Sequence, residues 1–317
     1  MSTLSLVFLL LAALPAGLLA FEKFAPGRAA LIALAFERRR ARLVWDSVSI
    51  PGAVMPYLEG GQGDTIVLLH GFAGDKDNFI RSAVHLTGHY HVVIPDLPGF
   101  GEASRDAGAH YTIDQQVINL RAFLYKLGLE RVHLGGNDMG GFIATEFAAR
   151  HPDQVASLWL LSAAGTAAAM DSDIVREYNA TGLVPWLLPH ADSIDALIDA
   201  TTTRAPFLPP SGRRRLGMRG AADFALHTQV LRELQNSPFL EARFYRIEAP
   251  ALIVWGCDDR VHHPAGADAL RAIMPNSRVI LMPGIGHLPV VEAPRRCAAD
   301  YRAFLDALAR APAAGAA

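Results

Sequence analysis

Three residues whose side chains could act together in nucleophilic catalysis, Asp138, Asp259 and His287, each follow a short apolar segment. Asp138 stands at the centre of a Gly-x-Asp-x-Gly motif. Such a motif is typical of a nucleophile elbow, a sharp strand-to-helix turn that exposes its central side chain, although an ordinary glycine-rich turn has the same outline. His287 could hold or relay a proton, while Asp259 fixes the tautomer of the imidazole and stabilises its charged form. We therefore predict a catalytic triad in the order nucleophile, acid, histidine.

A triad of this kind also needs hydrogen-bond donors that stabilise a developing oxyanion. The backbone N–H of Met139, directly after the elbow residue, is one candidate. The other is the backbone N–H of Phe72, because the glycine-containing turn at residues 70–74 follows a predicted buried strand. We expect His70 to support this turn rather than to react.

Neighbouring polar residues leave alternatives for the triad. Asp258 could serve as the acid, but Asp259 is favoured by its distance from the end of the preceding strand. His287 could be a structural histidine of its loop. His262 and His263 are predicted to be surface residues rather than catalytic ones.

Alternating apolar segments and helical patterns indicate the elements that position these residues. Predicted strands cover residues 65–69, 92–94, 155–161, 251–256 and 278–282, and another short strand begins at residue 132 and leads into the motif. Predicted helices cover residues 113–127, 141–150 and 295–310. This alternation predicts an α/β fold with a mostly parallel sheet and helices on both faces, built from residues 45–162 and 246–312. Parallel strands end at one edge of a sheet, where the triad could converge. Asp96 is expected to be structural at its own turn.

Residues 163–245 interrupt the alternation, and we predict an inserted helical cap, or lid, over the site. Apolar side chains that could line a cavity beneath this cap are Leu183, Trp186, Leu187, Leu188, Phe207 and Leu208. Trp186, Leu187 and Phe207 are our substrate-binding candidates. The alternative is that these side chains form a small core of the cap itself.

The first 44 residues are predicted to attach the protein to a membrane. Residues 2–21 carry no charge and are long enough to cross a bilayer core as a helix. A cleaved signal peptide is the alternative, but no basic residue precedes the apolar run. The apolar segment 29–36 and the four arginines between residues 38 and 42 predict a juxtamembrane helix whose basic end meets lipid headgroups, unless they form a solvated linker. The positive-inside rule would place these arginines, and the catalytic domain, in the cytoplasm.

Composition narrows the class of protein. The chain has 317 residues, of which 51% are hydrophobic and 19% charged, as expected for a well-buried core with some apolar surplus. The net charge of −2 does not suggest a nucleic-acid partner. The only cysteines, Cys257 and Cys297, exclude a disulfide framework and a cysteine-rich metal site, and leave either one bridge or two free thiols.

Residues 55–310 resemble the α/β-hydrolase superfamily. The segments that carry the resemblance are 70–79 (HGFAGDKDNF), 96–101 (DLPGFG), 286–289 (GHLP) and 292–294 (EAP). With its predicted anchor the whole chain is most similar to membrane-anchored bacterial lipases and phospholipases A. The resemblance implies cleavage of acyl esters of lipids or other apolar esters, no cofactor and no metal. It also implies an inner-membrane location with the catalytic domain in the periplasm, which we favour over the orientation that the arginines predict. An anchored helix with an apolar face is compatible with a homodimer.

Position 138 departs from that family, which carries serine there. A carboxylate attacking an ester carbonyl would form an anhydride, and its tetrahedral intermediate would expel the carboxylate more readily than the alkoxide. Carboxylate nucleophiles instead characterise haloalkane dehalogenases and epoxide hydrolases, in which they attack saturated carbon. Those enzymes, however, commonly carry Trp where this chain has Met139, and epoxide hydrolases use two cap tyrosines, for which Tyr178 and Tyr245 are the candidates.

Three hypotheses follow from the sequence. The first is a membrane-associated lipid ester hydrolase in which Asp138 replaces the expected serine and impairs ester hydrolysis. The second is an active hydrolase of epoxides or haloalkanes that uses Asp138 as its nucleophile. The third is a non-catalytic member that binds lipid or a partner in its cap cavity.

Overall fold

A single mixed sheet forms the centre of the computed structural model, which describes residues 17, 19–106, 108–182 and 184–310. Its strands are β1 (Val44–Ile50), β2 (Ala53–Gly60), β3 (Thr65–Leu69), β4 (His91–Pro95), β5 (Val132–Asn137), β6 (Val155–Leu161), β7 (Ala251–Gly256) and β8 (Ser277–Met282). They are arranged in the order β1-β2-β4-β3-β5-β6-β7-β8. Strand β2 is antiparallel to both of its neighbours, and the strands from β4 to β8 are parallel. The predicted mostly parallel sheet is therefore confirmed.

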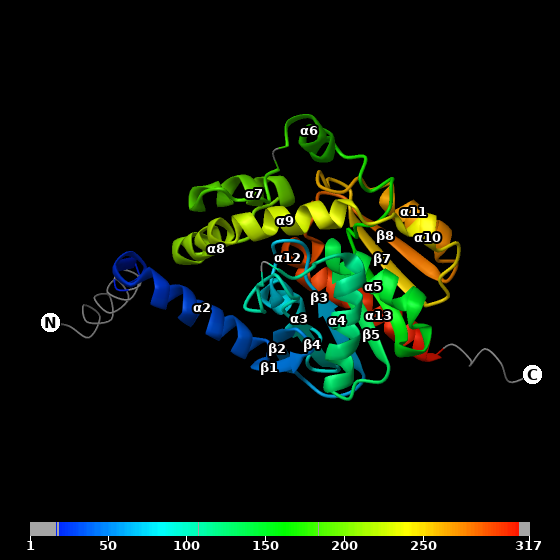
Figure 1. Ribbon diagram of the computed structural model, residues 1–317. Coiled ribbons are helices and arrows are strands. Elements are labelled where there is room, and N and C mark those ends of the chain that lie inside the picture. The colour runs from blue at the N-terminus through cyan, green and yellow to red at the C-terminus, as the bar shows by residue number, and fades with distance from the viewer. Residues whose placement is uncertain (1–16, 18, 107, 183, 311–317) are drawn as a thin grey trace, which may run out of the picture.

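Helices cover both faces of the sheet (Figure 1). The elements packed around it are α3 (Ile80–Ala83), α4 (Ile113–Lys126), α5 (Met139–Arg150), α11 (Gly266–Ile273), α12 (Pro289–Glu292) and α13 (Pro294–Arg310), with short 3-10 turns η1 (Lys76–Phe79) and η2 (Pro152–Gln154). Helices α4, α5 and α11 bury their apolar sides in one cluster with one face of the sheet. Helices α3, α12 and α13 form a second cluster with the other face. Because both faces are covered, the central strands are mostly apolar and almost entirely buried.

Residues 163–245 contain a separate group of helices. These are α6 (Asp173–Thr181), α7 (Ile194–Thr201), α8 (Pro210–Ala222), α9 (Phe224–Gln235) and α10 (Leu240–Arg243), with the 3-10 turn η3 (Ala191–Ser193). Helices α6 to α9 lie above the central strands and above α3 and α4 in Figure 1. Part of the segment has its own small apolar cluster, centred on Leu188, Ile194 and Ile198. An ion pair between Arg219 of α8 and Asp75 ties the segment to the loop after β3.

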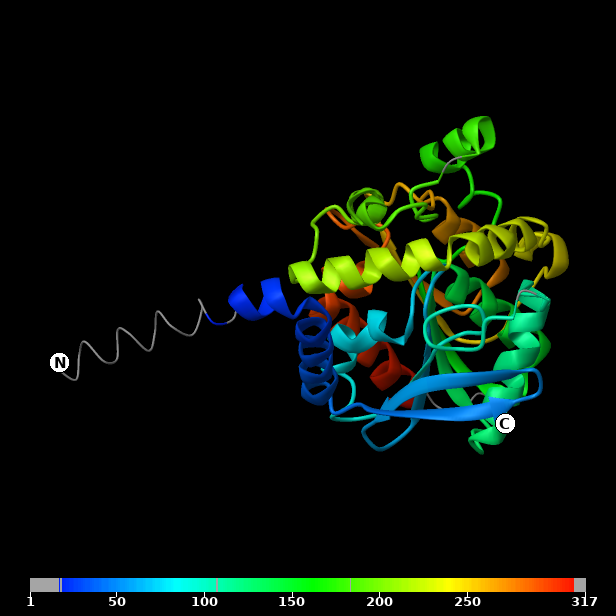
Figure 2. The same ribbon diagram turned by 60° about the vertical axis from the view of Figure 1, so that its left-hand side comes forward.

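Helix α2 (Pro26–Arg40) precedes the sheet and contains the segment predicted as a juxtamembrane helix. It packs against α8, beside which it lies in Figure 2. The Arg38 guanidinium makes two hydrogen bonds to the Asp77 carboxylate, at 2.8 and 2.7 Å. Within the described residues no helix combines the length and the apolar character that a bilayer crossing requires. The predicted span at residues 2–21 lies mainly in residues 1–16 and 18, outside the described part of the chain.

The sequence did not reveal the hairpin of β1 and β2. These strands are joined through Pro51 and Gly52, and Gly52 adopts a φ of +81° that favours glycine. The two cysteines are both free, and Cys257 is exposed whereas Cys297 is buried. The disulfide that the sequence left open is therefore not formed.

Candidate functional site

The turn that carries Asp138 has the geometry of a nucleophile elbow. Asp138 joins β5 to α5 with φ 55° and ψ −123°, a conformation that costs energy for a residue with a side chain. A Cβ added to Gly136 would lie 2.2 Å from the carbonyl carbon of Gly140, and one added to Gly140 would lie 2.2 Å from the carbonyl oxygen of Leu69. Only glycine fits at these two positions. The spacing of the motif therefore reflects backbone contact on both sides of the turn.

Asp259 and His287 form a buried pair at the ends of β7 and β8. Asp259 Oδ2 and His287 Nδ1 are 3.0 Å apart, and the two residues are 7% and 4% exposed. Burial alone would lower the pKa of His287, but the carboxylates of Asp259 and then Asp138 outweigh it and raise this pKa above its ordinary value. Burial would likewise raise the pKa of Asp259, but interaction with His287 holds it below its ordinary value. The pair thus has the orientation and the charge expected of the acid–base half of a triad.

The two oxygens of the Asp138 carboxylate face different partners. Oδ2 accepts a hydrogen bond from the backbone N–H of Phe72 at 2.7 Å, which is one of the two predicted oxyanion donors. Oδ1 lies 3.5 Å from Nε2 of His262. Met139, the other predicted donor, begins α5 and lines the same cavity. The carboxylate therefore occupies the position beside Phe72 that a substrate oxyanion would need.

His262 belongs to the site, and its prediction as a surface residue is wrong. It is 4% exposed, and its ring packs edge-on against that of His287 with centroids 4.9 Å apart. Its Nδ1 lies 3.1 Å from the carbonyl oxygen of Ser162. Burial lowers the pKa of His262, although Asp138 acts in the opposite direction. Asp259 Oδ1 accepts hydrogen bonds from the backbone N–H groups of Val261 and His262, at 2.9 Å each, and so holds the loop that carries this ring.

The other residues considered from the sequence lie where they were expected. Nδ1 of buried His70 lies 2.8 Å from the carbonyl oxygen of Gly71, and its Nε2 accepts from the backbone N–H of Leu97, so the ring supports the oxyanion turn. Buried Asp96 accepts hydrogen bonds from the backbone and the ammonium group of Lys76. Asp258 and His263 are exposed, and Asp258 is not the acid that contacts His287.

A cavity of about 1000 Å³ opens onto Asp138, His262 and His287. Its apolar lining comes from residues 163–245, from α2 and from the loops and helices around the elbow, including Phe72, Met139 and Leu288. Contributors include Ala33, Leu34 and Phe36 of α2, and Trp186, Leu188, Leu197, Phe207 and Leu208. Trp186 and Phe207 therefore lie where they were predicted. Leu187 does not line the cavity, whereas its neighbour Leu188 does. Leu183 lies outside the described residues.

Known proteins resemble this chain over nearly its whole length. The family model described as alpha/beta hydrolase fold matches residues 64–294. Lipase 3 of Moraxella sp. (strain TA144) is 34% identical over 281 residues, which cover 86% of this chain and 88% of the relative. The crystal structure of a membrane phospholipase A, described as a novel bacterial virulence factor, is 38% identical, with a TM-score of 0.88 over 98% of this chain and 100% of that one. A putative lipase from Acinetobacter baumannii is 26% identical, with a TM-score of 0.82 over 88% of this chain and 96% of that one.

Proposed function

The chain belongs to the α/β-hydrolase family, and from this premise we propose that it is a membrane-associated lipid carboxylic-ester hydrolase in which Asp138 impairs ester hydrolysis. The lipases and the membrane phospholipase A among its relatives support lipid esters as the substrate class. The apolar cavity beside the triad supports the same class, because ligand sites of this kind combine apolar walls with a few placed polar groups.

The observation that carries the proposal is the hydrogen bond from the Phe72 N–H to Asp138 Oδ2. Ester hydrolysis requires that this N–H stabilise the negative oxygen of the tetrahedral intermediate. In this protein the donor is already engaged by a carboxylate oxygen from the nucleophile position. Ester binding in the productive orientation would therefore have to displace a charge-assisted hydrogen bond and bring the substrate oxygen next to a carboxylate. Both requirements oppose the reaction.

The identity of the nucleophile opposes it as well. Attack by Asp138 on an ester carbonyl would give an intermediate from which the carboxylate leaves more readily than the alkoxide. The reaction therefore returns to the starting ester. The Asp259–His287 pair, in contrast, retains the hydrogen bond that would orient the base for a serine nucleophile.

A second candidate function, hydrolysis of epoxides or haloalkanes, is favoured by the same hydrogen bond. If Asp138 attacked saturated carbon, the Phe72 N–H would polarise the carbonyl of the resulting alkyl-enzyme ester, which water could then attack. The residues that would assist ring opening do not support this candidate. The Tyr178 hydroxyl donates to Gln235 at 3.1 Å, Tyr245 is 91% exposed, and neither lines the cavity.

The deciding experiment compares the native protein with Asp138→Ser and Asp138→Ala on a short-chain p-nitrophenyl ester, a phospholipid and an epoxide. We expect the serine variant to raise kcat/KM for the esters by at least about 10³-fold, because a complete triad is worth about 10⁶ in rate. The alanine variant vacates the oxyanion position without supplying a nucleophile and should remain inactive. Epoxide turnover by the native protein that is lost in both variants would refute the proposal. Inactivity of all three proteins would instead favour a non-catalytic binding role.

For location, we propose an N-terminal anchor in a bacterial inner membrane with the catalytic domain in the periplasm. Two apolar side chains of α2 face solvent and do not line the cavity, Leu31 and Ile32, and they support a membrane or a second copy of the chain as the neighbour of this helix. Alkaline phosphatase fused after residue 310 would be active in intact cells if the domain is periplasmic. Activity of a cytoplasmic reporter at the same position would refute this orientation.

A further inference from the structure

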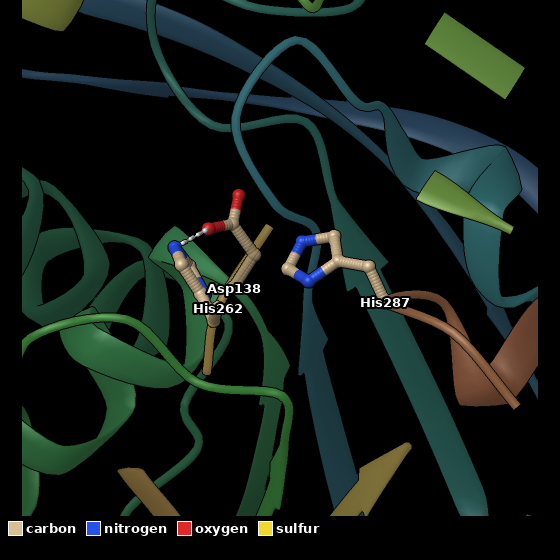
Figure 3. Close-up of side chains that lie close together, drawn as sticks. All are labelled: Asp138, His262 and His287. Carbon is tan, nitrogen blue, oxygen red and sulfur yellow. Dashed lines mark ion pairs between the residues drawn. The ribbon is translucent and has the colours of Figure 1, made fainter. Parts of the chain in front are cut away.

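Three side chains that can each donate an electron pair converge at the mouth of the elbow. Figure 3 shows Asp138, His262 and His287 together, with the Asp138 carboxylate directed toward His262. One ligand atom from each residue lies within 4.8 Å of the others, and both histidines are buried. The triad predicted from the sequence contains two of these residues, and His262 is the third member of the group.

Hydrogen bonds made by Nδ1 orient both imidazoles in the same way. Nδ1 of His262 lies 3.1 Å from the carbonyl oxygen of Ser162, and Nδ1 of His287 lies 3.0 Å from Asp259 Oδ2. Both partners are acceptors, so each Nδ1 carries the proton. In a neutral imidazole with this tautomer, Nε2 has no proton and presents its lone pair. For His262 this lone pair faces Oδ1 of Asp138 at 3.5 Å.

A carboxylate oxygen and an imidazole nitrogen that both present lone pairs repel unless a proton or a metal ion lies between them, and burial disfavours the extra proton on the ring. The Asp138 carboxylate is held in place through Oδ2 by Phe72, so Oδ1 cannot simply turn away. We propose that Asp138 Oδ1, His262 Nε2 and His287 Nε2 bind a divalent transition-metal ion, for which zinc is the best match. Two imidazoles and one carboxylate form a donor set that zinc uses at sites with an open coordination position. This proposal goes beyond the function proposed above and departs from the expectation of a metal-free site.

The distances allow such a site with a small adjustment. Zinc bonds of about 2.0–2.2 Å place tetrahedral ligands about 3.3 Å apart. The separation of 3.5 Å between Asp138 Oδ1 and His262 Nε2 is close to this value. The widest ligand pair, at no more than 4.8 Å, must close by rotation of a side chain.

The surroundings match those of zinc sites in two further respects. A histidine that binds zinc commonly donates its other N–H to a carboxylate or a backbone carbonyl, which are the partners of His287 and His262 here. All three ligand residues also line the cavity, so a fourth coordination position can face it. A serine at position 138 would remove the charged ligand. The residue that impairs the ester chemistry is thus the residue that makes the metal site possible.

Metal binding can be tested without any substrate. Full-length protein without an affinity tag, purified in detergent and treated with a chelator, is titrated calorimetrically with zinc chloride at pH 7.5. Cobalt(II) is added in parallel, because its visible absorption reports coordination by four ligands. We expect one equivalent to bind. Asp138→Asn, His262→Gln and His287→Gln should each weaken binding at least about 100-fold. Asp259→Asn, which alters the support of both histidine ligands, should weaken it about 10- to 100-fold.

Two matched controls separate this site from adventitious binding. His263→Gln removes the adjacent exposed imidazole, and Cys257→Ser removes the exposed thiol. Both should retain one equivalent with unchanged affinity. Absence of stoichiometric binding to the native protein would overturn the proposal, as would binding that survives in Asp138→Asn and His262→Gln. Because the readout is binding, the result is independent of whether Asp138→Ser gains ester hydrolysis.

Discussion

Two histidines face Asp138 from neighbouring loops, and their surroundings differ in one respect. His287, in the loop after β8, places its Nδ1 against the carboxylate of Asp259. His262, in the loop after β7, places its Nδ1 against the neutral carbonyl of Ser162. Both rings are almost fully buried, yet the pKa of His287 is raised and that of His262 is lowered. Burial opposes the charged form of both rings, so the charge of the partner decides the direction.

The comparison indicates a division of roles between two similar rings. His287 is suited to hold a proton during a reaction, because Asp259 stabilises its charged form. His262 is suited to remain neutral and to present a lone pair. The two roles are not independent, since Asp259 also accepts the backbone N–H groups of Val261 and His262. One carboxylate thereby positions both histidines.

The largest expected effect is a difference in esterase activity between variants of the two histidines. In an Asp138→Ser background, His287→Gln should lower kcat/KM for a p-nitrophenyl ester by about 10³-fold or more, because the serine loses its base. In the same background, His262→Gln should lower it by less than about tenfold. Steady-state kinetics of both double variants provide the measurement. Equal losses in the two would show that the assignment of the base to His287 alone is incorrect.

A smaller effect concerns the residue that links the two rings. Asp259→Ala removes the acceptor of one side-chain and two backbone hydrogen bonds in a buried region, and should lower the free energy of unfolding by about 3 kcal/mol. The neighbouring exposed variant Asp258→Ala should change it by less than about 0.5 kcal/mol. Urea unfolding followed by tryptophan fluorescence measures both. A similar stability for the two variants would contradict the role of Asp259 as a shared support.

The smallest effect is a difference in titration. In the metal-free protein, NMR should place the pKa of His287 above its ordinary value of 6.5 and that of His262 below it. Because the folded pKa of His287 is the higher one, its contribution to stability is present below pH 6.5 and is lost as the pH rises through the folded pKa. Glu292→Gln should lower the pKa of His287 slightly, since Glu292 is the weakest of the three carboxylates that raise it. A His287 pKa at or below 6.5 in the native protein would remove the basis for the comparison.

Most strands of the sheet and most residues of the site could be predicted from the sequence, because local sequence patterns determine both. Strands β3, β6 and β7 were predicted at their observed bounds, since apolar runs of that length between turn residues have few alternatives. Asp259 and His287 could be found from their positions after such strands. The hairpin of β1 and β2 was missed because β1 is largely exposed and because β2 contains Pro56, which argues against a strand. Its Pro51-Gly52 turn was a usable signal.

Tertiary packing decided what the sequence left unresolved. His262 and His263 are adjacent and chemically identical, and contacts with the Ser162 carbonyl and the His287 ring hold His262 inside, whereas His263 is exposed. Leu187 and Leu188 pose the same problem, because both lie in an irregular turn and only the packing of the 163–245 helices directs Leu188 into the cavity. A single sequence does not distinguish such neighbours.

Helix α2 forms one wall of the cavity, and this has a thermodynamic consequence. The helix is held to the rest of the molecule by Arg38 on Asp77. In the segment before the helix, Glu22 accepts hydrogen bonds from the backbone and hydroxyl of Ser211 on α8. A ligand that fills the cavity contacts both α2 and the remaining fold. It therefore binds more tightly when α2 is packed against the fold than when the helix has moved away. The coupling is reciprocal. The factor by which packing of α2 increases the affinity for the ligand equals the factor by which the ligand increases the equilibrium constant for packing of α2. Any force that acts on the N-terminal helix is thus transmitted to the affinity of the cavity for its ligand.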